Sequence, residues 1–399
     1  MTDSETGSDA PDGDPMARPF EVPDGTGTRV AVVGAGAVGL TAASDLARAG
    51  ASVTVFERGA EPGSGSSGRA AGILYDAYAE DVDVRMAARA MARFRAFASA
   101  GGEFDVEPCP YVALARKDDE STGEAIAEAA ERMRVHGRDV TTTDGAGLRD
   151  RFGGSLATDD VGTAVVAEDA AWADPSAYVR DAAERARDAG VEVRTGVEVG
   201  VRADPPRVVG GGASEAFDAV LVAAGARTNA VLAEAGIEIA MKPYRVQALV
   251  SRRPYDGPIC YDATARAYFR PHPSGLLAGD GTELAEADPE SWSREGDETF
   301  VSEVSEVLRS RADHDPRVDR AWAGLCTATP DRKPLLGEIR EGVFVATGWH
   351  GHGFMWAPAS GEAVAAAMLG APAASIEPYD PRRFRGDEAF EVVEGMAVE

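Results

Sequence analysis

Three glycines form the part of this sequence whose spacing points most clearly to chemistry. Gly34, Gly36 and Gly39 follow the apolar run 29–33 with the spacing G-x-G-x-x-G. The first glycine permits a tight turn, and the second lets the backbone approach a pyrophosphate at a helix N-terminus. The third lets that helix pack closely on the preceding strand. The pattern predicts a dinucleotide-binding site.

The segment after the glycines supplies the acidic residue that such a site needs. Residues 37–49 read as a helix that Gly50 ends, and residues 52–56 read as a second strand with Glu57 at its end. A carboxylate at this position accepts hydrogen bonds from both hydroxyls of an adenosine ribose and repels a 2′-phosphate. The fingerprint therefore disfavours NADP and leaves NAD and FAD open.

The charge balance restricts the classes of partner. Among 399 residues, 40 are Lys or Arg and 67 are Asp or Glu, which gives a formal net charge of -27. Such a protein repels nucleic acid and anionic lipid, so we expect no nucleic-acid partner. Lysine occurs only at Lys117, Lys242 and Lys333. An acid-rich, lysine-poor composition is typical of halophilic proteins, in which concentrated salt screens the repulsion between like charges.

The cysteines and the N-terminal segment bear on the compartment. Cys109, Cys260 and Cys326 are widely spaced, so the sequence predicts neither a disulfide framework nor a metal site. No stretch reaches the roughly 20 uninterrupted apolar residues of a membrane-spanning helix. Residues 1–28 are acidic and glycine-rich, lack a positively charged start, and are expected to be disordered. These features predict a cytoplasmic protein without an integral membrane segment.

The remaining pattern predicts an α/β fold in which one domain interrupts another. The alternation of helix and strand recurs at 173–196, whereas 242–280 alternates polar and apolar positions between Pro and Gly turns, as in an antiparallel sheet. We expect a Rossmann-type dinucleotide-binding domain interrupted by an α+β substrate domain. The first comprises 29–100, 145–240 and 321–385, and the second comprises 101–144 and 241–320.

Six motifs occur in an order that resembles one flavoenzyme family. They are GAGAVG at 34–39 with Glu57, GSSGRAAG at 65–72, KPYRVQ at 242–247, YFRPHPSGLLAGD at 268–280, TPDRKPLLG at 329–337 and GWHGHGFMWAPASGEAVA at 348–365. Together they resemble the FAD-dependent D-amino acid oxidase superfamily, especially its sarcosine oxidase-like and glycine oxidase-like branch, from residue 29 to about residue 372. The resemblance implies FAD as the cofactor.

FAD is too long to be held by the first glycine turn alone. The glycine-lined segments 64–72 and 348–353, with Gly225, can supply further contacts. A helix that begins near Pro358 would aim its positive end at its N-terminal loop, where a reduced flavin carries negative charge. The expected cofactor-binding residues are Gly34, Gly36, Ala37, Val38, Gly39, Glu57, Arg58, Ser67, Gly68, Arg69, Ala70, Ala71, Gly72, Val199, Ala224, Gly225, Gly348, His350, Gly351, His352, Gly353 and Phe354.

The resemblance also implies a reaction. A carbon that bears an amine transfers hydride to flavin N5, and water hydrolyses the resulting imine, while the protein orients and tunes the cofactor. The expected substrate is an amino acid or a secondary amine, and the electron acceptor is oxygen or a carrier. A dehydrogenase of a 2-hydroxy acid or of glycerol phosphate is the alternative within the same fold.

Two of the family's usual substrate-binding residues are absent. Cys326 stands in AGLxxxTPD where glycine oxidase-like members carry an arginine, and Met355 follows GHGF where sarcosine oxidase-like members carry a lysine. Cys326 is also offset from the cysteine that attaches FAD in some sarcosine oxidases, so we expect noncovalent FAD. The candidate catalytic residues are Arg270, then Arg245 and Arg69, together with Tyr268 and His352.

Overall fold

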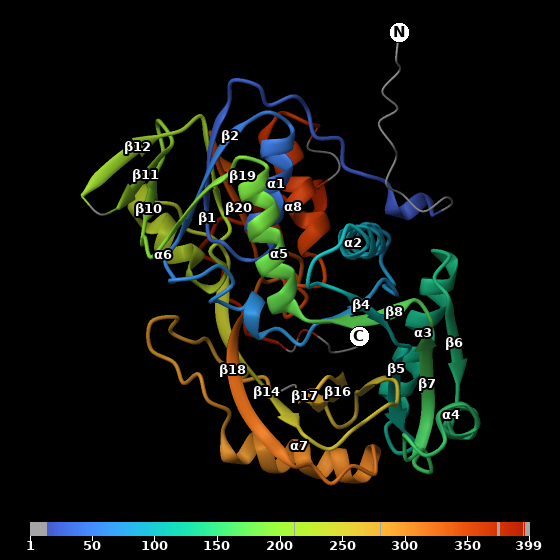
Figure 1. Cartoon of the computed structure of the whole chain (residues 1–399). Coiled ribbons are helices and arrows are strands. Elements are labelled where there is room, and N and C mark those ends of the chain that lie inside the picture. Colours follow the sequence, from blue (N-terminus) through green and yellow to red (C-terminus); the bar gives the residue numbers. More distant parts are fainter. Residues whose placement is uncertain (1–13, 211, 280, 373–375, 394, 396–399) are drawn as a thin grey trace.

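The structure, a computed structural model, describes residues 14–399 apart from 211, 280, 373–375, 394 and 396–399. A six-stranded sheet forms its upper part in Figure 1, and its strands pair in parallel except where β19 meets β20. Central parallel strands are buried on both faces, which explains their apolar composition. In sheet order the six strands are β19 (Leu335–Arg340), β20 (Val343–Thr347), β13 (Ala219–Val222), β1 (Arg29–Val33), β2 (Ser52–Glu57) and β9 (Glu192–Thr195).

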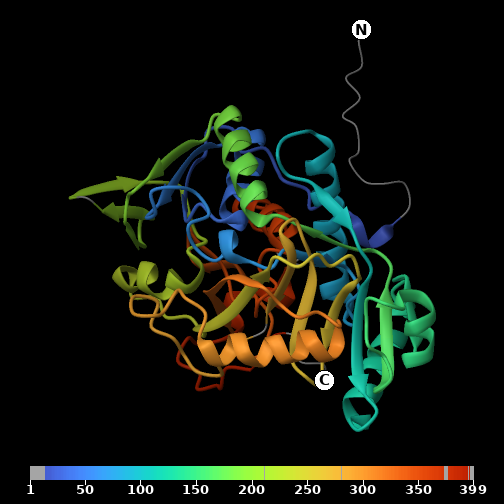
Figure 2. The same cartoon turned by 60° about the horizontal axis from the view of Figure 1, so that its bottom comes forward.

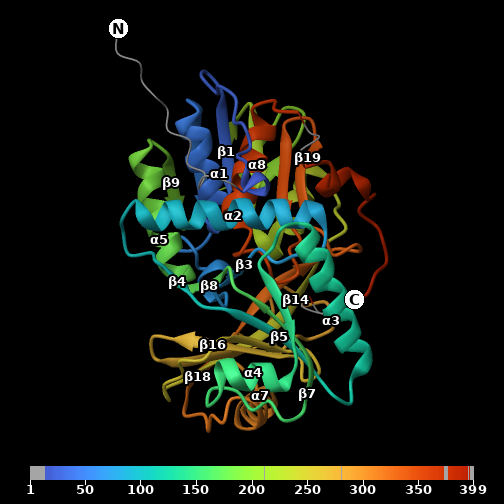
Figure 3. The same ribbon diagram turned by 90° about the vertical axis from the view of Figure 1, so that its right-hand side faces the viewer.

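Helices cover the side of this sheet that lies to its right in Figure 1 and faces the viewer in Figure 3. Helix α1 (Ala37–Arg48) packs between α5 (Pro175–Asp188) and α8 (Ala357–Met368), and α2 (Asp81–Ser99) crosses over α8 (Figure 3). Helix α8 can approach α1 closely because it presents Gly361 there, where an added Cβ would lie 2.7 Å from the Thr41 Cβ. The N-terminal ends of α1 and α8 are thereby held at the same side of the sheet.

An eight-stranded mixed sheet forms the lower domain. Helix α7 (Glu298–Arg311) lies across its outer face (Figure 2), while α3 (Glu120–Val135) and α4 (Gly145–Phe152) pack at the end that carries β7. Phe300, Val304 and Leu308 of α7 fill a core with apolar residues of the sheet. In sheet order the strands are β18 (Val318–Ala328), β14 (Lys242–Ser251), β17 (Gly275–Gly279), β16 (Ala267–His272), β15 (Ile259–Asp262), β5 (Tyr111–Arg116), β7 (Val161–Ala167) and β6 (Val140–Thr143).

Two small antiparallel sheets complete the fold. One packs with α6 (Thr228–Leu232) beside the six-stranded sheet, and the other lies between the two large sheets. The first consists of β10 (Gly200–Arg202), β11 (Arg207–Gly210) and β12 (Ala213–Ala216), and the second of β3 (Ile73–Tyr75), β8 (Ala170–Ala173) and β4 (Val106–Pro108). None of the helices in the described part of the chain is long and apolar enough to cross a membrane.

The predicted fold class is confirmed, but the strand pairing differs from the boundaries expected at residues 145 and 321. Strands β7 and β18 both pair in the eight-stranded sheet rather than in the dinucleotide-binding domain. Strand β18 pairs with β14 along its length, from Ala328 opposite Lys242 to Arg320 opposite Val250. The second half of β18 is apolar, as in a buried parallel strand. This composition explains why the sequence predicts that β18 belongs to the dinucleotide-binding domain.

The N-terminal segment also differs from the expectation of disorder over 1–28. Residues 1–13 lie outside the described residues, but 14–28 pack against the protein. A short 3-10 turn, η1 (Pro15–Ala17), follows Asp14, whose carboxylate pairs with Arg138 at 3.0 Å. Phe20 is buried, and its backbone N–H donates to Glu362 Oε2 at 3.4 Å. Phe20 and the Asp14–Arg138 pair together anchor a segment whose average composition is polar.

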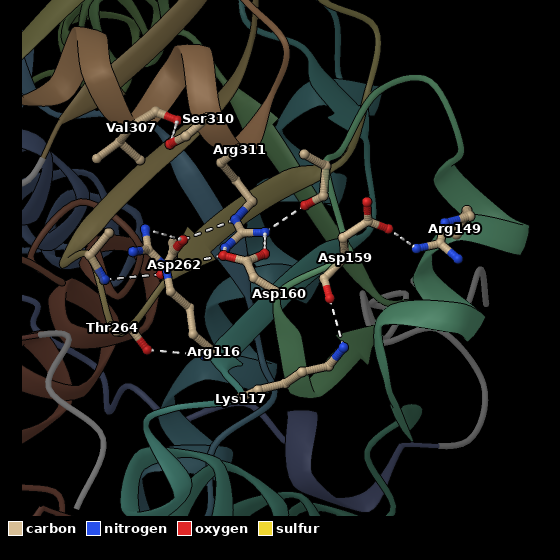
Figure 4. Close-up of polar contacts among 12 residues, drawn as sticks. Arg116, Lys117, Arg149, Asp159, Asp160, Asp262, Thr264, Val307, Ser310 and Arg311 are labelled. Carbon is tan, nitrogen blue, oxygen red and sulfur yellow. Dashed lines mark hydrogen bonds and ion pairs between the residues drawn. The ribbon is translucent and has the colours of Figure 1, made fainter.

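A buried arginine fixes α7 to the sheet (Figure 4). Arg311 donates from Nε to Asp262 Oδ2 at 2.9 Å and from Nη1 and Nη2 to the Asp160 carboxylate at 2.7 and 3.0 Å. Arg116 Nη2 reaches the same Asp262 oxygen at 3.4 Å. Arg311 and Asp262 are both buried, so each charge depends on the other for compensation. Through Asp262 and Asp160, Arg311 connects α7 to β15 and to the turn before β7.

Candidate active site

Two adjoining cavities form a continuous groove at the boundary between the domains. They share Gly36, Ser66, Ser67, Arg69, Ala223, Gly225, Ala226 and Leu325 among their lining residues. The half that contains Glu57, called here the acidic end, also includes Val199 and Arg294. The other half, called the aromatic chamber, is walled by Tyr75, Tyr244, Tyr268, Trp322 and Trp349. The groove has the extended form that a dinucleotide requires.

The glycine turn shapes the centre of the groove. Gly34 has a φ of +110°, and an added Cβ there would overlap the Ala223 carbonyl. Gly36 lines both cavities and precedes the first residue of α1, whose Ala37 N–H donates to the Ser67 hydroxyl at 3.1 Å while the Gly36 position itself carries no capping side chain. The positive end of the helix dipole therefore faces the groove, where it stabilises an anionic group.

Glu57 closes the acidic end at the carboxyl end of β2. Its Oε2 accepts a hydrogen bond from the Ala35 N–H at 2.8 Å, and its Oε1 accepts one from the Gly59 N–H at 2.6 Å. Oε1 also accepts a hydrogen bond from the Ser64 hydroxyl at 3.4 Å, so Oε2 is the oxygen that retains acceptor capacity for a ribose hydroxyl. Arg58 lines the same end and pairs with Glu198 at 3.3 Å.

The lining of the groove fits FAD in two further respects. At Gly225 and Gly351, both with positive φ, an added Cβ would meet no atom within 4 Å, so a larger residue could project into the space that a ligand needs. Trp349 Nε1 and His350 Nδ1 are buried side-chain atoms on the chamber wall that have no hydrogen-bond partner among the described residues. Buried polar atoms normally have partners, and the acceptors of a bound flavin would provide them.

His350 is held in one tautomer. The Thr329 N–H donates to His350 Nε2 at 2.7 Å, so this nitrogen carries no proton and Nδ1 must be the N–H donor. Burial, followed by the neighbouring His352, lowers the pKa of His350 to about 4, so the ring is neutral at pH 7. Its φ of +47° is rare for a residue with a side chain. His350 thus lines the groove and carries a buried Nδ1–H that has no partner among the described residues.

Tyr75 and His352 of the aromatic chamber are also neutral at pH 7. The Tyr75 hydroxyl lies 3.5 Å from His352 Nε2, and the Tyr75 ring stacks on Tyr111 at 4.6 Å between centroids. Burial raises the pKa of Tyr75 to about 12 and lowers the pKa of His352 to about 4. Arg69 is the only cation among the described residues that line the chamber, and these residues include no carboxylate.

The three arginines expected to bind substrate have different surroundings. Arg69 lines both halves of the groove, and Trp322 Nε1 donates to its carbonyl at 3.1 Å. Arg270 lines neither half, because its Nε donates to the Ala71 carbonyl at 2.6 Å behind the chamber wall. Burial lowers the pKa of Arg270 to about 10, and its guanidinium lies 4.8 Å from the Trp172 ring centroid. Arg270 therefore supports the wall from outside the groove.

Arg245 also lies outside the groove, in contrast to the role expected from its motif. Its guanidinium pairs with Glu283 and, at 2.8 Å, with Asp297. Successive side chains of a strand point to opposite faces, and Tyr244 and Val246 on either side line the chamber. Gln247, on the same face as Arg245, does line the chamber, so it is the contacts with Glu283 and Asp297 that hold Arg245 away, and Arg245 is not a substrate-binding candidate.

Most of the expected cofactor-binding residues line the groove. Gly39, Gly68 and Gly348 do not, but an added Cβ at each would press against atoms beneath the groove, at Gly68 2.6 Å from the Gly63 carbonyl oxygen. The expected residues that line it are Gly34, Gly36, Ala37, Val38, Glu57, Arg58, Ser67, Arg69, Ala70, Ala71, Gly72, Val199, Ala224, Gly225, His350, Gly351, His352, Gly353 and Phe354. Sequence reasoning missed Tyr75, Tyr244, Gln247, Arg227, Trp292, Arg294 and Gly395.

Comparison with known proteins identifies the family. Residues 29–367 match the family described as FAD dependent oxidoreductase. Glycine oxidase from Pseudomonas aeruginosa is 29% identical over 374 residues, which cover 88% of this chain and 98% of that protein. The structure of L-proline dehydrogenase from P. horikoshii has a TM-score of 0.81 and 27% identity, and the match covers 92% of this chain and all of the other.

Glycine oxidase from Geobacillus kaustophilus has a TM-score of 0.80 at 22% identity, which supports the fold, with 90% of this chain and 99% of the other covered. The resemblance to the D-amino acid oxidase superfamily is confirmed, and so is the expectation of an enzyme. The chain belongs to the D-amino acid oxidase family of FAD-dependent oxidoreductases, and FAD is its cofactor.

Proposed function

We propose that this flavoenzyme oxidises the C–N bond of an amino acid or a secondary amine. The observation that carries the proposal is the groove itself, which runs from Glu57 past the N-terminus of α1 into a chamber walled by tyrosines of both domains. Two relatives whose names state their substrates, glycine oxidase and L-proline dehydrogenase, support an amino acid rather than a hydroxy acid.

Bound FAD supplies the hydride acceptor, and water hydrolyses the imine that the substrate becomes. The acidic end binds the adenosine ribose through Glu57, and the N-terminus of α1 stabilises the pyrophosphate. In the aromatic chamber the Tyr75, Tyr244 and Tyr268 rings exclude water from the reacting carbon. The electrons pass on to oxygen or to a carrier.

Arg69 is the group that we propose to bind the substrate's anionic end. It is the chamber's only cation among the described residues, and Trp322 fixes its backbone. Its Nη1 donates to the Ser64 and Gly65 carbonyls at 2.5 and 2.9 Å, and the guanidinium would exchange these contacts for the substrate's anionic group. A charge-assisted hydrogen bond contributes about 1.5 to 3 kcal/mol, so Arg69→Ala should lower kcat/KM by roughly 10- to 150-fold. Arg58→Ala, at the acidic end, is the matched control and should leave substrate KM unchanged.

The substrate nitrogen should bind in its neutral form. The described residues of the chamber provide no carboxylate that could pair with an ammonium, and a buried unpaired charge is costly. The neutral amine also has a lone pair, which stabilises the positive charge that develops on the substrate carbon as the hydride leaves it. The value of kcat/KM should therefore rise with pH until the free substrate amine is deprotonated.

An anaerobic screen tests the proposal. Acid should first release the flavin from the polypeptide, as noncovalent FAD requires. Amino acids, N-methyl amino acids, 2-hydroxy acids and glycerol phosphate are then added separately, and flavin bleaching is recorded. Bleaching by an amine supports the proposal, whereas bleaching by hydroxy acids or glycerol phosphate alone would overturn it in favour of a hydroxyl dehydrogenase.

A further inference from the structure

A C-terminal segment outside the family match reaches the aromatic chamber. The match ends at residue 367, and the chain then passes through η7 (Pro381–Arg383) on the FAD-binding domain. Figure 3 shows this part of the chain, in red, descending towards the other domain. We call residues 390–393 with Gly395 the C-terminal strap.

The strap is anchored to the first residue of β14. Lys242 Nζ donates a hydrogen bond to the Phe390 carbonyl at 2.7 Å, and the same ammonium lies 4.8 Å from the centroid of the Phe390 ring. Lys242 thus binds both the backbone and the side chain of one strap residue. These two contacts fix the strap next to the first residue of β14.

Val392 packs on the back of the chamber wall. It is 6% exposed and forms an apolar cluster with Tyr244 and Ala328, against which Val246 and Cys326 also pack. Three members of this cluster, Tyr244, Val246 and Cys326, line the chamber. The next strap residue, Val393, is 40% exposed and faces solvent.

Gly395 enters the chamber lining itself. An added Cβ at this position would overlap the His350 carbonyl and lie 3.1 Å from the His350 Cβ. The strap backbone therefore approaches residues 348–353, called here the flavin-side loop, more closely than a side chain would allow. The strap therefore contacts the substrate-domain sheet through Val392 and the FAD-domain loop through Gly395. It spans the two domains where the chamber lies between them.

We infer that the C-terminal strap is a wall of the substrate chamber and sets the size of substrate that the chamber admits. The inference rests on the proposed function, because it takes the chamber as the site of the amine. With the strap in place, the chamber excludes water and long side chains. Without it, the Tyr244 and Cys326 side of the chamber is open to solvent.

Thiol labelling tests the wall without any substrate. Cys109 and Cys260 are buried, whereas Cys326 is partly exposed beneath the strap, so iodoacetamide reports on the chamber through Cys326. Val392→Asp should accelerate labelling by roughly tenfold or more, because a buried charge drives the strap off the wall. Val393→Asp adds the same charge at the exposed neighbour and should label at the wild-type rate. Cys326→Ser identifies the labelled site.

Equal labelling rates for Val392→Asp and the wild type, with FAD still bound, would overturn the inference. If Val392→Asp fails to retain FAD, removal of residues 389–399 provides a second test, and slow labelling of that shortened holoenzyme would be equally decisive against it. The flavin absorbance per polypeptide shows in each case that the protein is folded.

Substrate size provides the second arm. For two substrates that share the reacting amine but differ in side-chain length, Val392→Asp should raise the kcat/KM ratio of long to short substrate by roughly tenfold, and Val393→Asp should not change it. An unchanged ratio would overturn the role in specificity. If no amine bleaches the flavin, the proposed function fails, while the labelling result still decides whether the strap covers the chamber.

Discussion

His350 offers the sharpest test of how this chain tunes its flavin. Its Nδ1–H is buried on the groove wall without a partner among the described residues, and Thr329 fixes the tautomer from the other side of the ring. His350→Leu removes the donor. His350→Asn keeps an amide donor, keeps an acceptor for Thr329, and tolerates the positive φ better than most residues.

The size of the effect follows from the charge of the acceptor. A hydrogen bond to a neutral acceptor contributes about 0.5 to 1.5 kcal/mol, and one to a charged acceptor contributes about 1.5 to 3 kcal/mol. Reduced flavin carries the negative charge, so the donor stabilises it over the oxidised form by about 1 to 1.5 kcal/mol. For a two-electron couple this difference is roughly 20 to 30 mV. His350→Leu should lower the midpoint potential by that amount, and His350→Asn should recover most of it.

An anaerobic redox titration against a reference dye measures the shift. His314→Leu is the matched control, because His314 is equally buried but bonds Ser251 Oγ at 2.9 Å in the other domain, away from the groove. Wild-type potential in His350→Leu with FAD bound would refute the reasoning, as would an equal shift in the His314 variant.

Three further outcomes can be measured directly. Gly225→Leu places a side chain in the groove and should yield protein that folds by circular dichroism but lacks flavin absorbance; Gly212→Leu, also at positive φ with open space, should keep its FAD. Burial lowers the pKa of His350 from 6.5 to about 4 on folding, so between these pH values the folded chain binds fewer protons than the unfolded chain. The free energy of unfolding, measured in urea, should therefore fall as the pH drops from 6.5 to about 4, and it should fall less steeply in His350→Asn. Asp262→Asn breaks the buried pair with Arg311 and should cost about 3 to 5 kcal/mol of that free energy, whereas Asp159→Asn, at an exposed pair in the same view, should cost at most about 1 kcal/mol. A Gly212 variant without flavin, a pH slope that His350→Asn leaves unchanged, or equal costs for the two aspartates would contradict these expectations.

Local signals explain why the cofactor half of the site could be predicted. The turn at Gly34 and Gly36, the helix after it and Glu57 lie within one β–α–β unit, and each depends on neighbours in sequence. The same holds for the helix that starts with Asp174 as its cap and Pro175 at its first position. Such elements are specified by short-range steric and hydrogen-bonding preferences.

The substrate half depends on long-range pairing, which the sequence does not reveal. Whether Arg245 enters the chamber is decided by the contacts of its buried side chain with Glu283 and Asp297, which lie far along the chain. Arg270 is a strand residue whose length lets it reach the Ala71 carbonyl instead of the chamber. Val392 and Gly395 reach the site from the end of the chain. No motif in the sequence around them indicates that they contact the chamber.

The burial of Phe20 has a practical consequence for protein production. Its N–H shares Glu362 with Arg89 and Arg93, which reach that carboxylate from α2, and Glu362 lies in the helix that begins directly after the flavin-side loop. Trimming the chain to residue 29, where the family match begins, would uncover this carboxylate and loosen α8. Expression vectors should therefore retain the chain from residue 14 onward, and an affinity tag should be spaced away from Asp14 so that its pair with Arg138 survives.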